Sequence, residues 1–298
     1  DQLHAAAGAL DASLVSQDAV DGIDMLRGTR LFGQRGFQFG EPFLQIVSRD
    51  YGAPLAGLDF ATQPEVSRAV INAWVSDLTR QLIEELMPSG TITSDTRLVI
   101  VDAQYMKATW LTEFDPDQTR DAPFHLSDSD IQDVPMMSAA LDIPYLEGDG
   151  YDAGELPYVG DRLAMLVIVP EDLAAFESRL TGERLSAIIG SLRSTTIPVG
   201  LPRFEARQHA KLLPVLAELS ITNLGDLSGI APGLFVAAVE HEAVVKVNEE
   251  GTEAAAATGI GIRVCACPNP ELIADHPFLY FVRDRLTGSI LFMGRVAD

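Results

Sequence analysis

Two cysteines and five histidines are the residues of this chain that most readily bind metals or act as nucleophiles. Cys265 and Cys267 are one residue apart, a spacing that does not readily close an unstrained disulfide, and the chain has no other cysteine. A metal site would need further ligands nearby, and none is evident. His241-Glu242 is followed by Ala-Val-Val without a second histidine, which argues against zinc. We therefore expect no metal and no cofactor.

The sequence lacks the signatures of the common enzyme classes. It has no Gly-x-Ser-x-Gly nucleophile elbow and no Walker loop. The stretch TGIGIRV, at 258–264, contains one Gly-x-Gly but lacks the third glycine of a dinucleotide loop. An enzyme that used Cys265 would need a partner histidine, and none stands in a suitable sequence context. These motifs therefore indicate no enzyme class.

One segment is too small to pack. Residues 252–261, TEAAAATGIG, follow a strand-like run and contain almost nothing that could anchor a core. Propensity alone favours an alanine-rich surface helix or a plain loop. In a strand, Thr252, Ala254, Ala256 and Thr258 would share one face, with Glu253 on the other, wet face. The composition therefore permits two states, an exposed loop or a strand added between two existing strands.

The charge of the chain limits its partners. The net charge is −22, from 43 acidic and 21 basic side chains, which disfavours nucleic acid and anionic membrane surfaces as partners. No apolar run is long enough to cross a bilayer. The opening residues Asp1-Gln2-Leu3-His4 do not have the basic start and apolar stretch of a signal peptide.

The elements that would position these residues indicate a mixed α+β fold in one domain, 1–298. Helical spacing of apolar residues predicts helices over 3–14, 43–51, 64–83, 171–180 and 183–193. Apolar runs predict strands over 97–110, 161–170, 195–204 and 234–247. A terminal hairpin is expected over 276–296, with its turn at Leu286-Thr287-Gly288.

Several segments resemble one protein family. VNEEGTEAAAAT (247–258) resembles the hinge of the serpins, the serine protease inhibitor family, and HPFLYFVRDRLTGSILFMGRV (276–296) resembles their C-terminal signature. Further similar segments follow in the family's order: LFGQRGF, INAWVSDLT, QYMKATW, FH…VPMM, LPRFEA and DLSGI. The resemblance runs from about Asp1 to Asp298. It implies a serpin-like fold with a large central mixed sheet, additional sheets and helices, and an exposed reactive-centre loop at 249–267.

The resemblance implies a suicide-substrate inhibitor of serine proteases, with cysteine proteases as a further target class. The protease cleaves the loop, becomes acylated on it, and is trapped when the loop inserts into the sheet as a strand. The alternative is a non-inhibitory serpin that acts as a protease substrate or a binding protein. A monomer is expected, with polymers formed by loop–sheet exchange, and the family favours an extracellular location. The implied hinge consists of Glu249, Glu250, Gly251, Thr252, Glu253, Ala254, Ala255, Ala256, Ala257 and Thr258.

The scissile bond is placed by counting along the loop. Seventeen residues from Glu249 inclusive place the cut between Cys265 and Ala266, whereas counting back from Phe278 gives a position about one residue later. A cysteine there would suit the small or medium apolar pocket of an elastase- or subtilisin-like protease. The rival is Arg263–Val264, because a guanidinium suits a trypsin-like pocket that carries an aspartate.

Three further positions match control points of the family, and a fourth departs from the family's pattern. Trp110 and Arg203 match the breach at the top of the sheet, where Arg203 would pair with Glu249. His241 matches the histidine of the shutter, and Asp102 stands where the family usually has an asparagine that supports it. The chain begins near the family's helix D, so the preceding helices are not in this sequence. No basic helix D is evident, and heparin-type activation is not expected.

Overall fold

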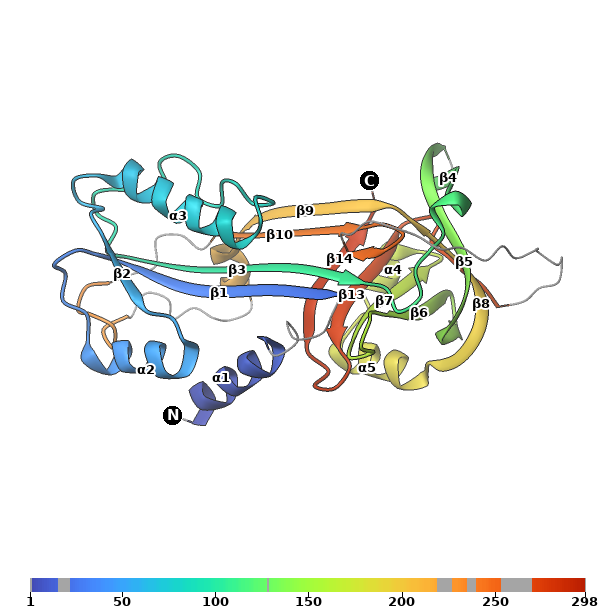
Figure 1. The fold of residues 1–298 in the computed structure, drawn as a ribbon, viewed down its shortest axis with the longest axis horizontal. Helices are drawn as coiled ribbons and strands as arrows, with labels where there is room; N and C mark the ends of the chain where they lie inside the picture. The colour runs from blue at the N-terminus through green and yellow to red at the C-terminus, as the bar shows by residue number, and fades with distance from the viewer. Residues whose placement is uncertain are drawn as a thin grey trace. The chain divides into compact units, whose positions relative to one another are not determined.

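The computed structural model describes residues 2–15, 22–127, 129–218, 227–234, 240–252 and 270–297 (Figure 1). The helices are α1 (Gln2–Val15), α2 (Glu41–Tyr51), α3 (Pro64–Leu78), α4 (Leu173–Glu177), α5 (Gly182–Ser191), α6 (Leu212–Glu218) and the 3₁₀ helix η2 (Pro116–Gln118). The strands of the first half are β1 (Ile23–Gln34), β2 (Leu55–Leu58), β3 (Leu98–Thr109), β4 (Arg120–Ser127) and β5 (Asp130–Gly148). The later strands are β6 (Tyr151–Pro157), β7 (Leu163–Pro170), β8 (Arg193–Pro202), β9 (Phe204–Lys211), β10 (Glu240–Val247), β11 (Gly251–Thr252), β12 (Leu272–Ile273), β13 (Phe278–Asp284) and β14 (Ile290–Val296).

The described strands form three sheets. One has the order β11-β3-β1-β2 and is mixed, because β1 and β2 are parallel whereas β11 and β3 are antiparallel. A second consists of β10 and β9. The largest has eight strands, in the order β12-β8-β5-β6-β7-β13-β14 with β4 paired to β5. The α+β class with a large mixed sheet is the one predicted.

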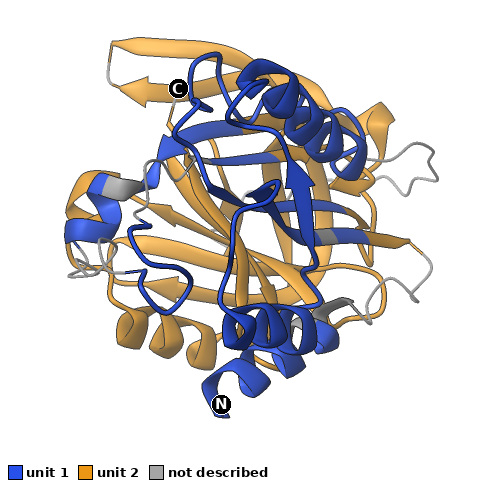
Figure 2. Ribbon diagram, turned by 90° about the vertical axis from the view of Figure 1, so that its left-hand side faces the viewer, with its two compact units in different colours: residues 1–19, 25–106, 207–244 blue, residues 20–24, 107–206, 245–298 orange. Residues whose placement is uncertain are grey.

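The chain divides into two compact units, shown in different colours in Figure 2. The first contains residues 1–19, 25–106 and 207–244, and its core packs α3 against β3 and β1. The second contains residues 20–24, 107–206 and 245–298, and all eight residues of its strand β7 are buried. Because the chain enters each unit more than once, no single cut in the sequence separates them. The single domain over 1–298 stays a prediction.

Helix α3 is shorter than its apolar spacing predicted. The predicted helix over 64–83 begins correctly at Pro64 but ends at Leu78. Arg80 and Gln81 have positive φ values of 50° and 66°, a conformation that terminates a helix. Ile83 is nevertheless 2% exposed, because a turn rather than the helix brings it into the core. The apolar spacing therefore predicted the burial of Ile83 correctly, but its prediction that the helix continues to Ile83 was wrong.

The strand predictions were better for buried runs than for proline-containing ones. β3, β7 and the hairpin β13–β14 lie within their predicted ranges, and the hairpin turn has Gly288 at φ 76°. The predicted strand over 195–204 crosses a break between β8 and β9 at Arg203. The 19-residue strand β5 was missed, because its prolines at 135 and 144 argue against a strand interior.

Candidate functional site

A tight turn precedes β11. Asn248 and Gly251 exchange backbone hydrogen bonds of 2.9 and 3.2 Å, which closes the turn. Gly251 has a φ of 145°, and a Cβ at this position would lie 2.0 Å from the carbonyl oxygen of Ala108. Only glycine fits this approach. The chain then pairs antiparallel with the end of β3, Gly251 opposite Thr109 and Thr252 opposite Ala108.

Trp110 contacts this turn through its side chain and its backbone. Its side chain is 2% exposed and stacks on Tyr158 with ring centroids 4.6 Å apart and an interplanar angle of 7°. The indole Nε1 donates to the carbonyl of Asn248 at 3.0 Å, and the backbone N–H of Trp110 donates to the carbonyl of Glu250 at 2.7 Å. The indole satisfies its donor while burying its ring, which fits a residue that positions the turn rather than simply filling space.

Arg203 forms the main ionic contact of the turn. Its Nε lies 2.7 and 2.8 Å from the two carboxylate oxygens of Glu249, and the hydroxyl of Thr119 also donates to that carboxylate. Burial raises the pKa of the Glu249 carboxyl, but the hydrogen bonds from Arg203 and Thr119 outweigh it and hold that pKa below 4.5. The Glu249 side chain is 6% exposed, so the carboxylate depends on these donors.

Replacing Arg203 by methionine should loosen the turn. The arginine stem would be kept, but the ionised Glu249 would lose a charge-assisted contact of roughly 1.5–3 kcal/mol. We expect spontaneous loss of the native form on warming to speed up about tenfold, measured as loss of the native band on native gels. Arg203→Lys should restore part of the contact. Wild-type rates in Arg203→Met would exclude a role for the ion pair in holding the turn.

Thr252 is the first residue of the segment 252–261, and its side chain is buried. It is 5% exposed, and its hydroxyl lies 2.9 Å from the hydroxyl of the fully buried Tyr158. In the four-stranded sheet, β3 lies between β1 and β11. β11 pairs with the C-terminal end of β3, at Thr109 and Ala108.

The sequence singled out part of this group. Trp110, Arg203 and Glu249 come together, whereas Tyr158 and Thr119 were missed because a single tyrosine or threonine carries no local signal. Asp102 and His241 belong to the other compact unit, in β3 and β10, and their side chains are exposed. Their shutter roles stay predictions. The remaining hinge residues Glu253–Thr258 and both proposed reactive bonds, at 263–266, lie outside the described residues.

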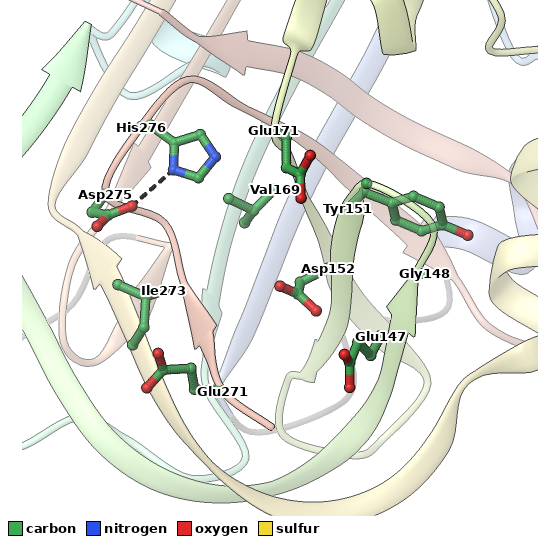
Figure 3. Close-up of a pocket in the computed structure, with 11 residues that line it drawn as sticks. Glu147, Gly148, Tyr151, Asp152, Val169, Glu171, Glu271, Ile273, Asp275 and His276 are labelled. Carbon is green, nitrogen blue, oxygen red and sulfur yellow. Dashed lines mark hydrogen bonds and ion pairs between the residues drawn. The ribbon is translucent and has the colours of Figure 1, made fainter. Parts of the chain in front are cut away.

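A separate cavity of about 290 Å³ lies in the second unit (Figure 3). Five carboxylates and His276 line it, and the Nδ1 of His276 donates to the carboxylate of Asp275 at 2.8 Å. Within the described part of the chain, no group of three His, Cys, Asp or Glu side chains is placed to hold a metal ion. The acidic residues that line the cavity are Glu147, Asp152, Glu171, Glu271 and Asp275.

None of the described helices is both long and apolar enough to cross a membrane.

The Asp275–His276 pair should make stability depend on pH. The hydrogen bond to Asp275 raises the pKa of His276 above 6.5, against the opposing effect of burial. Protonated His276 therefore stabilises the fold fully below pH 6.5, and this contribution is lost as pH rises through the raised pKa. Both side chains are about one-third or more exposed, so the effect is small. His276→Gln should flatten the thermal midpoint against pH in that window; an unchanged profile would contradict this assignment.

Comparison with known proteins defines the class of the molecule. The family described as "Serpin (serine protease inhibitor)" matches residues 1–298, and the chain belongs to the serpin family. This membership places it among protease inhibitors rather than enzymes.

Individual relatives are similar over most of the chain. Leukocyte elastase inhibitor from Bos taurus is 40% identical over 287 residues, which cover 90% of this chain and 76% of the relative. Serpin B4 from Homo sapiens is 35% identical over 295 residues, covering 94% and 76%. The crystal structure of uncleaved ovalbumin superposes with a TM-score of 0.85 at 26% identity, covering 96% of this chain and 81% of ovalbumin. Serpin48 from the insect Tenebrio molitor gives 0.84 at 28% identity, covering 98% and 80%.

Proposed function

We propose that this chain inhibits serine proteases as a suicide substrate, by adding its cleaved loop to the edge of β3. The observation that carries the proposal is the antiparallel pairing of Gly251 and Thr252 with Thr109 and Ala108 at the end of β3. An unpaired edge presents backbone donors and acceptors that a further strand would satisfy. Gly251 and Thr252 would then be the first two residues of the inserted strand.

Continuing this register predicts the contacts of the inserted strand. Glu253 would lie opposite Lys107, Ala254 opposite Met106 and Thr258 opposite Asp102. An opposite-charge cross-strand pair at the first position is favourable. The small side chains at the following positions would pack beside β3 without steric conflict. This would explain why most side chains of residues 252–261 are small.

The target is proposed to be an elastase- or subtilisin-like serine protease. The relatives named leukocyte elastase inhibitor support this class, and Cys265 before the cut would suit a small or medium apolar pocket. A trypsin-like protease that cuts after Arg263 is the rival target. The inhibitor is proposed to act as a monomer.

The reactive bond can be read from the cleavage products. We expect an elastase-type protease to release a C-terminal peptide that begins at Ala266, detected by mass spectrometry. Arg263→Ala should leave this product and its rate within about twofold of wild type, because only the residue directly before the bond fills the main specificity pocket. Cys265→Arg should instead make the protein a target of trypsin-type proteases. A peptide that begins at Val264 would move the reactive bond to Arg263.

The proposed function is tested by mixing the full chain with a panel of serine proteases and with papain-type cysteine proteases. A covalent complex that survives SDS supports trapping of the acyl-enzyme. Cleavage in the loop without a complex would indicate the alternative, a serpin that acts as a substrate. Absence of cleavage by every protease would contradict both. A large rise in the thermal midpoint after loop cleavage would independently show insertion.

A further inference from the structure

Glu250 is a buried acid in the turn before β11. The residue is 7% exposed, and its Oε2 atom is the one buried side-chain nitrogen or oxygen without a hydrogen-bond partner in the part of the chain that the structure describes. A buried, unpaired carboxylate oxygen is costly when the group is ionised. Such an atom requires an explanation.

Backbone contacts hold Glu250 in the turn. The Glu250 carbonyl accepts from the N–H of Trp110 at 2.7 Å, and its own N–H donates to the Asn248 side chain at 3.2 Å. Gly251 follows directly, in close contact with the backbone of β3. Lifting the turn away from β3 would therefore expose the Glu250 carboxyl to solvent.

The charges around Glu250 oppose its ionisation. Burial, first, and then the nearby carboxylate of Glu113 raise its pKa above 4.5; Glu249 adds to this, while Lys107 has the opposite effect. The preceding residue behaves in the opposite way, because Glu249 is satisfied by Arg203. The buried Tyr158 below the turn stays neutral, since burial raises its pKa.

We infer that Glu250 acts as a pH-sensitive latch of the hinge, which seats the turn on β3 when its carboxyl is neutral and favours release of the turn when it is ionised. This role rests on the proposed function only in its consequence, which is that acidification would favour the first step of strand insertion. The sign follows from linkage, because a proton binds more tightly to the seated form, in which the carboxyl is buried, than to the released form.

Hydrogen–deuterium exchange tests the latch without any protease. Peptides that contain Gly251 and Thr252, and those that contain Thr109 and Trp110, report whether the turn is seated. For the wild type, we expect protection to rise from about pH 7.5 to about pH 5, after division by the intrinsic exchange rate at each pH. Glu250→Gln mimics the neutral acid and should be protected at every pH, about fivefold or more above wild type at neutral pH.

Matched variants separate the latch from general effects of charge. Glu183→Gln, at an exposed position of α5 in the same compact unit, should follow the wild-type profile. Glu113→Gln should move the wild-type transition to lower pH, because it removes a repelling charge from the environment of Glu250. Glu250→Met provides a second neutral side chain of similar size should the glutamine variant fold poorly.

The outcomes distinguish this inference from the proposed function. Equal protection of wild type and Glu250→Gln at all pH values, or weaker protection of the variant at neutral pH, would overturn the latch even where SDS-stable complexes form. A pH-dependent difference in a protein that traps no protease would support the latch and overturn the proposed inhibition instead.

Discussion

We expect that replacing Thr252 by arginine turns the proposed inhibitor into a substrate, which its target protease cleaves without being trapped. Thr252 is 5% exposed, and its hydroxyl contacts the buried hydroxyl of Tyr158. A guanidinium at this position would be an unpaired buried charge, which costs several kcal/mol. Since about 1.4 kcal/mol corresponds to a factor of ten, slowing insertion by this amount would lower the yield of SDS-stable complex by tenfold or more.

A matched substitution controls for the added charge. Thr196 lies in β8 with an exposed side chain, and Thr196→Arg should form complexes as the wild type does. Thr252→Ser should also remain inhibitory, because it keeps the hydroxyl and the small size. The measurement is the ratio of complex to cleaved inhibitor on SDS gels. Full complex formation by Thr252→Arg would show that loop insertion does not require a small, uncharged side chain at this position.

Removing the carboxylate of Glu155 should destabilise the second unit more than any other single change discussed. Glu155 is 2% exposed and accepts from the Nε of Arg283 at 2.6 Å, with the Nε of Arg285 at 3.1 Å from its other oxygen. Arg283 is 8% exposed, so Glu155→Ala would leave a buried guanidinium without its main partner. Loss of one member of a buried ion pair costs about 3–5 kcal/mol.

The free energy of unfolding, measured by urea denaturation, tests this expectation. Glu155→Gln keeps one acceptor for Arg283 and should lose less stability than Glu155→Ala. Glu183→Ala, at an exposed site of α5, should stay within about 0.5 kcal/mol of wild type. If the double replacement of Glu155 and Arg283 by apolar residues recovered nothing beyond the single change, the unpaired charge would not be the cause.

The fold was predictable where local pattern and burial agree. The buried strand β7 and residues 278–282 of β13 are continuous apolar runs, and the glycine at the turn identifies the hairpin β13–β14. The end of α3 and the strand β5 were not predictable in this way. In the first, apolar spacing continues into a turn; in the second, prolines and polar residues sit in a strand whose pairing with β4, β6 and β8 decides its structure.

The site was partly predictable for a similar reason. Resemblance pointed to Trp110, Arg203 and Glu249, and the structure brings these three together around one turn. Tyr158 and Thr119 contact the same turn from distant parts of the sequence, 94 and 130 residues away from their partners Thr252 and Glu249. No periodicity or motif records a contact of that kind.

By itself, the sequence determined the chemistry that the hinge permits. Apart from Glu253, the side chains from Thr252 to Thr258 are small, which permits either an exposed loop or an added strand, and the charge of the chain disfavours polyanionic partners. Only the tertiary structure decided which of two adjacent glutamates is satisfied. The carboxylate of Glu249 forms an ion pair with Arg203, whereas one carboxylate oxygen of Glu250 is buried without a hydrogen-bond partner. The two side chains extend from the same turn toward different neighbours. A buried charge is stable only where the fold supplies its partner.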